Sequence, residues 1–285
     1  MSMLTIAIPT YNSSIYLKEC IKGFVNSEFV NEIIIGDDSS SSSELLEIKR
    51  IIDEVNIFFP FDIKLFENSE NTGAFLNKYS LISRAKNNWV YQIDSDNVPD
   101  NIDEAFKEII NSKNPKAIYY PSKIIQFRKY KYIAKFLSKF NKKYRVIFSK
   151  ETLVFDKNTV KKAIEENIHY EQKRVNSANK NEYPELKSLF VNEKHIFWVL
   201  NSGNFITKKS QFIDFTKKGL EYDRNLLSLD AVAISYLWFK NGGEIQLQKE
   251  LKHFHRKRYD SVSFTEKESS ELSRKFFTNK FLDLI

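Results

Sequence analysis

The stretch VYQIDSDN, residues 90–97, joins a short apolar run to two aspartates that stand two positions apart, Asp94 and Asp96. Two earlier stretches share this design, IAIPTYN at 6–12 and IIIGDDSS at 33–40. Short apolar runs that end in polar turn residues are typical of strands buried on both faces of a parallel sheet. The three stretches therefore predict three such strands, each with polar side chains at its carboxyl end.

Helices between these strands are predicted by apolar residues at helical spacing. Over the first hundred residues we expect strands at 3–9, 31–36, 62–66 and 89–93, and helices at 15–26, 43–56 and 75–85. This alternation predicts an α/β fold with a doubly wound, mostly parallel sheet and helices on both faces. Ligands of such sheets bind beyond the carboxyl ends of the strands. We therefore expect the loops Thr10–Asn12, Asp37–Ser39 and Asp94–Asp96 to meet at one site.

The second half of the chain has a weaker pattern, and residues 151–200 have no clear periodicity. We expect strands at 117–120 and 242–248, a strand and turn at 198–210, a polar loop at 252–263, and helices at 101–111, at 229–239 and from 265 onward. Two helix caps are also predicted, Ser43 for the helix at 43–56 and Asp100 for the helix at 101–111.

The composition is that of a globular protein of 285 residues with one cysteine, Cys20. A single cysteine excludes a disulfide framework within the chain and a cysteine-based zinc site. The first residues enter an apolar strand without a secretory signal, and no run of 18 apolar residues predicts a membrane span. We therefore expect a cytoplasmic protein.

Positive charge is concentrated between Ile109 and Lys150, where twelve lysines and arginines occur without an acidic residue. Because the whole chain carries a net charge of +7, the remainder is net negative, and this basic block is a candidate docking face for an anionic partner. Four apolar residues in the block follow the spacing of one helix face: Ile133, Phe136, Leu137 and Phe140. Such a helix either makes a peripheral contact with an anionic membrane or packs on the sheet with a solvated basic face. No nucleic-acid motif accompanies it.

The two aspartates of the opening stretch favour a metal site, although a solvated turn would also explain them. Residues two apart on a strand share a face, so both carboxylates can approach one point. Carboxylates that converge repel each other unless a cation lies between them. One or two carboxylates together with substrate phosphates are the usual ligands of Mg²⁺ in such sites.

Four stretches, IAIPTYN (6–12), IIIGDDSS (33–40), NTGAFLNKY (71–79) and VYQIDSDN (90–97), occur in an order and spacing that resemble the family 2 glycosyltransferases. Later stretches resemble the acceptor-side strand, the acidic helix start and the closing histidine loop of that family: NSGNFITKKS (201–210), SLDAVAISYLW (228–238) and HRKRYDS (255–261). The resemblance implies the GT-A fold over residues 1–262. Residues 1–100 would bind the nucleotide sugar and 101–262 the acceptor, with a helical C-terminal tail at 263–285.

The resemblance also implies roles for single residues on the donor side. It assigns seven positions to the donor nucleotide: Pro9, Tyr11, Asn12, Asp38, Lys78, Asp94 and Ser95. The first three would line the base and ribose pocket. Asp38 would accept a hydrogen bond from the base, although capping of the following helix would also explain an acid there. Lys78 would approach the base or the phosphates, and Asp94 would contact the ribose.

The remaining implied roles concern the metal and the chemistry. Asp96 would hold Mn²⁺ or Mg²⁺ at the diphosphate, and Asp230 would be the catalytic base. His255 would be a late metal or diphosphate contact, with His253 as the competing candidate. The chain departs from the family at three positions: Ser39 replaces a frequent glycine, Leu229 replaces one acid of a pair, and Lys78 replaces arginine.

The resemblance therefore implies an inverting glycosyltransferase of bacterial type that uses a nucleotide-diphosphate sugar. A UDP-sugar is favoured over a GDP-sugar, for transfer of a hexosyl or N-acetylhexosaminyl group. The acceptor would be a glycan or a lipid-linked oligosaccharide, at the inner face of the plasma membrane if the basic block binds lipid. Two alternatives stay open: a nucleotidyltransferase, which the lack of a glycine-rich phosphate loop near the N-terminus opposes, and a member of the fold that binds sugar nucleotides without turnover.

Overall fold

The computed structural model describes residues 2–100, 102–112, 114, 116–127, 145–147, 152–174, 199–256 and 267–284. The strands are β1 (Leu4–Thr10), β2 (Val30–Asp37), β3 (Lys64–Glu67), β4 (Trp89–Gln92), β5 (Val98–Asp100), β6 (Ala117–Phe127), β7 (Arg145–Ile147), β8 (Leu153–Phe155), β9 (Phe205–Lys208) and β10 (Glu244–Arg256). The helices are α1 (Ser14–Lys22), α2 (Ser42–Asn56), α3 (Ala74–Arg84), α4 (Ile102–Asn111), α6 (Lys157–Arg174), α8 (Lys209–Thr216), α9 (Asp230–Lys240) and α11 (Lys267–Leu282), with short 3₁₀ helices η3 (Lys217–Glu221) and η4 (Arg224–Leu227). The amphipathic helix expected in the basic block lies outside the described residues.

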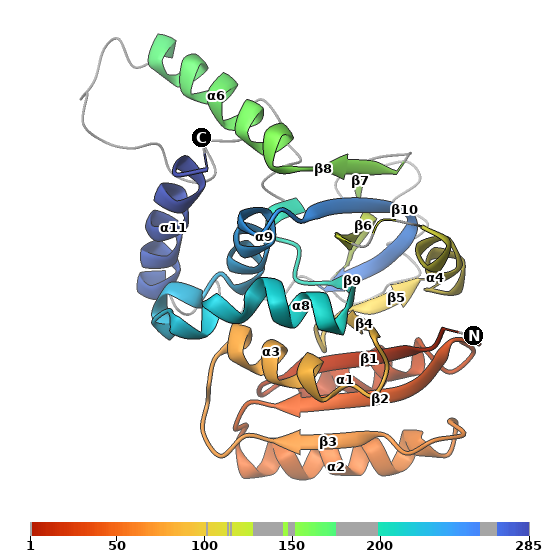
Figure 1. Cartoon of the computed structure of the whole chain (residues 1–285). Helices are drawn as coiled ribbons and strands as arrows, with labels where there is room; N and C mark the ends of the chain where they lie inside the picture. Colours follow the sequence, from red (N-terminus) through yellow and green to blue (C-terminus); the bar gives the residue numbers. More distant parts are fainter. Residues whose placement is uncertain are drawn as a thin grey trace.

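The described strands form one sheet in the order β3-β2-β1-β4-β9-β6-β10-β5, with β7 added on β6 and β8 on β10 (Figure 1). The first four strands in this order are parallel. Beyond them the sheet is mixed, because β9 runs antiparallel to β4 and β6 while β10 is parallel to β6. The predicted α/β class is confirmed, and the carboxyl ends of β1, β2 and β4 lie side by side as expected.

One face of the sheet is covered by α1, α2 and α4. The side chains of Ile6 and Ile8 on β1 join a buried cluster with Leu17 of α1, Ile48 of α2 and Phe106 of α4. Alternate residues of a strand point to opposite faces. The residues between them on β1 therefore belong to the other face.

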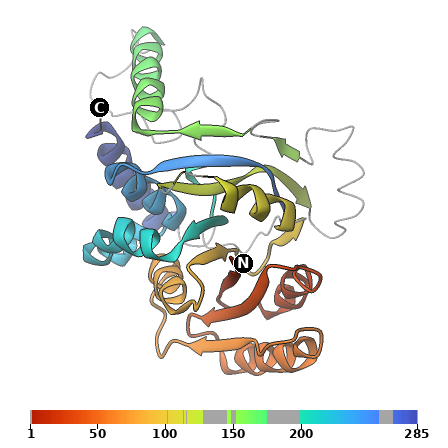
Figure 2. The same ribbon diagram turned by 45° about the vertical axis from the view of Figure 1, so that its right-hand side comes forward.

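The opposite face is covered by α3, α8, α9 and α11, which follow one another along that side in Figure 2. Ala7 of β1 contributes to this second cluster, together with Phe75 of α3, Phe212 of α8, Trp238 of α9 and Phe277 of α11. Helices on both faces are the doubly wound arrangement that the sequence predicts. No helix in the described part of the chain is long and apolar enough to cross a membrane.

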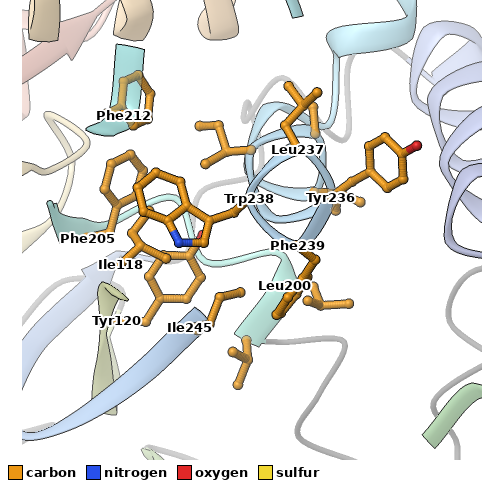
Figure 3. Packing of buried hydrophobic residues seen from close by; sticks show 14 of the residues in the cluster. Ile118, Tyr120, Leu200, Phe205, Phe212, Tyr236, Leu237, Trp238, Phe239 and Ile245 are labelled. Atoms are coloured by element: carbon orange, nitrogen blue, oxygen red, sulfur yellow. The ribbon is translucent and has the colours of Figure 1, made fainter. Parts of the chain in front are cut away.

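Helix α9 is enclosed by the second cluster along most of its length. All residues from Ala231 to Phe239 are buried, which is typical of a helix that is apolar on every side. Trp238 projects into a group that includes Phe205 and Tyr120 (Figure 3), and its indole N–H donates to the carbonyl of Lys116 at 3.0 Å. This packing holds α9 against the sheet.

The predicted cap of α2 is wrong by a small shift along the chain, and the predicted capping role of Asp100 stays a prediction. Helix α2 is capped by Ser41, whose hydroxyl accepts the N–H of Glu44 at 3.4 Å, whereas Ser43 lies inside the helix. Five consecutive serines offer the same cap chemistry, so local sequence alone does not select one. Asp100 is the last residue of β5, a strand that the sequence does not reveal, and α4 begins at Ile102.

Several predicted boundaries also move. Helix α1 ends at Lys22 rather than at residue 26, and β6 continues to Phe127 rather than ending at residue 120. Strand β10 runs from Glu244 to Arg256 and includes the start of the expected polar loop at 252–263. The polar residues extend the strand because β6 and β5 pair with it on both sides. Residues 257–263 lie outside the described part of the chain.

Candidate functional site

Hydroxyl groups tie the loops after β1 and β4 together at the carboxyl edge of the sheet. The side chains of Thr10 and Ser13 share a hydrogen bond of 2.9 Å, and Ser13 shares another, of 2.8 Å, with Ser95. All three side chains are buried. Ser95, assigned to donor binding from the sequence, is therefore a contact between two loops of the site.

The loops after β1 and β2 are also joined. The amide oxygen of Asn12 accepts the N–H of Ser41 at 3.0 Å, and the N–H of Asn12 donates to the Ser40 hydroxyl at 2.8 Å. Asn12 has a φ of 44° and Ser39 a φ of 65°, both in the left-handed region that glycine favours. The frequent glycine that Ser39 replaces is thereby explained, since the backbone keeps the left-handed conformation at this position.

Asp38 anchors the loop that leads from β3 into α3. Its carboxylate accepts hydrogen bonds from the Asn68 amide at 2.9 Å, from the N–H and hydroxyl of Thr72 at 2.8 Å each, and from the N–H of Gly73 at 2.8 Å. The side chain is buried. These bonds use much of the accepting capacity of the carboxylate, and its contact with a nucleotide base stays a prediction.

The two halves of the chain meet at the ammonium group of Lys78. Lys78 Nζ donates to Asp230 Oδ2 at 2.6 Å and lies 2.9 Å from Asp94 Oδ1. Lys78 is 4% exposed and Asp230 17%, whereas Asp94 is 36% exposed. The structure thus brings together the residues expected to be the catalytic base and a donor contact, and places a cation between them.

The charge of Lys78 is maintained by these two carboxylates. Burial opposes the charged form, but Asp230 and then Asp94 outweigh it, so the pKa of Lys78 is raised above its usual value. The lysine is held on α3, whose Asn77 donates from its side-chain amide to the carbonyl of Gly36 in β2 at 2.9 Å. Two carboxylates this close would repel each other without the ammonium group.

Asp94 also contacts the turn before β9 through its backbone. Its N–H donates to the side-chain oxygen of Asn204 at 2.8 Å, and the Gln92 amide donates to Asp94 Oδ1 at 3.1 Å. A Cβ atom at Gly203 would lie 2.6 Å from Asp94 Oδ2, so a larger residue there would require the Asp94 carboxylate to shift. Sequence reasoning does not assign these three supporting residues, although Gly203 and Asn204 lie in the quoted stretch NSGNFITKKS.

The same turn distinguishes the two histidines of β10. Asn204 uses its oxygen for Asp94, so its amide nitrogen donates to His253 Nε2, at 3.1 Å, and the imidazole proton lies on Nδ1. Burial, reinforced by His255, lowers the pKa of His253 to about 3, so the ring is neutral. His255 is only partly buried, and the two rings are 6.2 Å apart. His253 Nε2 is therefore already occupied by Asn204, and which of the two histidines contacts a ligand stays a prediction.

Asp94 and Asp96 are the acids predicted at this edge as metal ligands, and a metal site here stays a prediction. Asp94 and Asp96 are both partly buried beyond the end of β4, and after burial their charges raise the pKa of the Cys20 thiol. Within the described residues, no group of three or more histidines, cysteines and acids gathers at one point. A Mg²⁺ or Mn²⁺ ion whose coordination shell is completed by substrate phosphates needs only one or two carboxylates from the protein.

The other predicted donor residues lie at the same edge. Pro9 is buried in β1 opposite Gly36 of β2, and Tyr11 is 43% exposed in the loop that follows β1. Asn12 is exposed beside Tyr11. The structure therefore gathers the predicted donor positions of β1, β2, α3 and β4 around one sheet edge, with α9 contributing Asp230.

Residues 5–129 match the model of a protein family described as Glycosyl transferase family 2. The match runs from β1 to the end of β6 and covers less than half of the 285 residues. Among curated proteins, none matches the chain.

Two solved structures are similar to the whole fold. A crystal structure of S. aureus TarS, residues 1–349, in complex with UDP has a TM-score of 0.57 and 13% identity, covering 90% of this chain and 61% of that one. A crystal structure of GalNAc-T7 with UDP, GalNAc and Mn²⁺ has a TM-score of 0.56 and 15% identity, covering 90% of this chain and 44% of that one. The chain thus spans less than two thirds of the length of either protein. At these identities the likeness shows the fold, which is the GT-A fold of glycosyltransferases.

Proposed function

We propose that the chain is a glycosyltransferase that moves a sugar from a nucleotide-diphosphate sugar to a hydroxyl group of a glycan or lipid-linked oligosaccharide. The contact of Lys78 with Asp94 and Asp230 carries this proposal. It joins Lys78 of α3 to Asp230 at the start of α9, across 152 residues of sequence, and to Asp94 of a donor-side loop. In this proposal Asp230 lies beside the sugar. The family match and the two UDP-bound structures of the same fold support the reaction class.

Asp230 is the catalytic base in this proposal. Lys78 occupies its Oδ2, which leaves Oδ1 to accept the proton of the acceptor hydroxyl. As the O–H bond breaks, the acceptor oxygen forms a bond with the anomeric carbon, and the bond from that carbon to the diphosphate oxygen breaks. The leaving diphosphate keeps the electron pair. Attack from the side opposite the leaving group inverts the anomeric configuration.

The donor would occupy the edge formed by β1, β2 and β4. Pro9, Tyr11 and Asn12 would line the base and ribose pocket, and Asp94 would contact the ribose. Lys78 would neutralise Asp94 and Asp230 and approach the diphosphate. A UDP-sugar is the proposed donor, because UDP is the nucleotide bound in both similar structures.

Asp96, with His255 as the second candidate ligand, would hold Mn²⁺ or Mg²⁺. When bound, the ion would supply Lewis-acid stabilisation of the diphosphate leaving group. An imidazole ligand favours Mn²⁺ over Mg²⁺, which prefers oxygen. The transferred group is proposed to be a hexosyl or N-acetylhexosaminyl residue. A peripheral contact of the basic block with an anionic membrane would bring the enzyme to a lipid-linked acceptor.

A donor-hydrolysis screen tests this proposal. UDP- and GDP-sugars are incubated with the protein and Mn²⁺ or Mg²⁺, with and without a chelator, and the released nucleotide is identified. We expect nucleoside diphosphate that is lost with the chelator. Release of pyrophosphate would show a nucleotidyltransferase instead. Donor binding without turnover, in the presence of a range of glycan acceptors, would indicate a binding protein.

A further inference from the structure

Helix α9 begins without a cap of its own. Its N-cap residue is Leu229, which has no side-chain group to bond the free N–H groups of the first turn. Ser, Thr, Asp and Asn are the residues that normally do so. Asp230 is the next residue, so the uncapped turn is the one that carries the proposed catalytic base.

A serine from α11 takes part in this turn. The hydroxyl of Ser273 accepts the N–H of Leu229 at 3.3 Å and donates to the carbonyl of Leu226 at 2.9 Å. Ser273 is fully buried, and its bond to Leu229 spans 44 residues. In a capping box, a Glu or Gln three residues into the helix accepts the N–H of the N-cap residue. Ser273 makes the equivalent bond from a different helix.

Further contacts fix α11 at this position. The hydroxyl of Ser228 donates to the carbonyl of Ser269 at 2.8 Å, one turn of α11 before Ser273. Beyond Ser273, the ring of Tyr236 lies 5.8 Å from that of Phe277 and 5.6 Å from that of Phe281, on the side of α9 that faces α11 (Figure 3). The pair with Phe281 is edge-to-face, an attractive arrangement at this distance, and the pair with Phe277 is tilted.

We propose that Ser273 is a positioning residue for Asp230, so that this one side chain of α11 supports the catalytic base without contacting the substrate. This inference rests on the proposed function, in which Asp230 is the base. The hydroxyl of Ser273 lies between the N–H of Leu229 and the carbonyl of Leu226 and bonds to both. This fixes the backbone from which the Asp230 carboxylate reaches Lys78.

Helix α11 supplies a matched control. Ser270 is also a buried serine, three residues before Ser273, but its hydroxyl has no hydrogen-bond partner among the described residues. Replacing Ser273 or Ser270 by alanine removes the same atom from the same helix. Only Ser273→Ala removes a bond to the start of α9.

The experiment measures turnover, donor KM and amide exchange in the 285-residue chain. For Ser273→Ala we expect kcat to fall about tenfold to a hundredfold, because small displacements of a catalytic group cost factors of this size. Donor KM should stay within about twofold of wild type, since the donor loops are untouched. The exchange of the Leu229 amide, which should be slow in the wild type, should accelerate. Ser270→Ala should change none of these quantities.

A second pair removes the effect of side-chain volume. Ser273→Thr keeps a hydroxyl and Ser273→Val has the same shape without one, so the threonine variant should retain more turnover than the valine variant. Equal kcat in the two, or equal behaviour of Ser273→Ala and Ser270→Ala, would overturn the inference. Fast exchange of the Leu229 amide in the wild-type protein would also overturn the inference.

Asp230→Asn separates this inference from the proposed function. Full activity in Asp230→Asn would refute Asp230 as the base and with it the proposed mechanism, whatever Ser273 does. Loss of activity in Asp230→Asn together with wild-type kcat in Ser273→Ala would refute the positioning role alone.

Discussion

The donor-side edge and the start of α9 hold their functional groups in different ways. At the donor edge, loops at neighbouring strand ends bond to one another, as Ser13 and Ser95 do. At α9, the positioning groups come from distant segments: Lys78 lies on α3 and Ser273 on α11. The first arrangement follows from sheet topology, and the second depends on tertiary packing. Variants on the two sides should therefore fail in different ways.

The largest effect among variants of the two supporting networks is expected from Lys78→Met. Without the ammonium group, Asp94 and Asp230 face each other as unpaired carboxylates. We expect a loss of about 2–4 kcal/mol in the free energy of unfolding, measured with urea, because removal of one partner of a buried ion pair leaves uncompensated charge. Turnover should fall with it.

Two controls sharpen this result. Lys275→Met removes an exposed lysine that pairs with Glu271 on α11 and should cost less than about 1 kcal/mol. In an Asp230→Asn background, the additional cost of Lys78→Met should shrink, since one of the two carboxylates is gone. An equal cost in both backgrounds would mean that Lys78 and Asp230 do not interact.

Gly203→Ala should affect donor binding more than chemistry. The new methyl group would lie 2.6 Å from Asp94 Oδ2, so the Asp94 carboxylate must shift. We expect donor KM to rise about tenfold, which corresponds to about 1.4 kcal/mol. Isothermal titration with UDP checks the effect on binding directly. Unchanged UDP affinity and unchanged donor KM would show that Asp94 does not contact the donor.

Ser13→Ala tests the hydroxyl chain of the donor edge. It leaves Thr10 and Ser95 without a partner at a buried position, for which we expect a loss of about 1–3 kcal/mol in unfolding free energy. Ser83→Ala removes an exposed hydroxyl on α3 and should change stability by less than about 0.5 kcal/mol. Equal stabilities of the two variants would show that the hydrogen bonds among Thr10, Ser13 and Ser95 do not join the loops.

The smallest effect concerns Cys20, the only cysteine of the sequence. Burial first, and then the nearby Asp96 and Asp94, raise its pKa well above the usual value, so the thiol is protonated at pH 8. Because the thiolate is the reactive form, Ellman's reagent at pH 8 should react slowly with the native protein and fully after unfolding in urea. Fast reaction of the native protein would show that this edge is open to solvent.

The donor edge could be predicted because each strand and its polar end are adjacent in sequence. The positions of Thr10, Asp37 and Asp94 at one edge follow from the alternation of strands and helices alone. The cap of α2 cannot be selected from the sequence, because consecutive serines compete for the same role. The strand character of His253 and His255 was missed because pairing with β5 and β6, rather than local composition, extends β10.

The contacts of Asp230 depend on tertiary packing between distant segments, and they could not be predicted. Nothing near Leu229 in the sequence indicates that Ser273 bonds its N–H, and nothing near Lys78 indicates that its ammonium group bridges Asp94 and Asp230. These bonds span from 16 to 152 residues of sequence and depend on how α3, α9 and α11 pack on the sheet.

The central claim is that Asp230 acts on the acceptor while the donor-side residues bind the nucleotide sugar. Asp230→Asn tests it most directly, with transfer followed by released nucleoside diphosphate and donor binding followed by titration with UDP. We expect kcat to fall roughly 10²–10⁴-fold, the usual contribution of a general base, with UDP affinity within about threefold of wild type. Asp214→Asn, at an exposed position on α8, should leave both unchanged. Wild-type turnover in Asp230→Asn would contradict the claim.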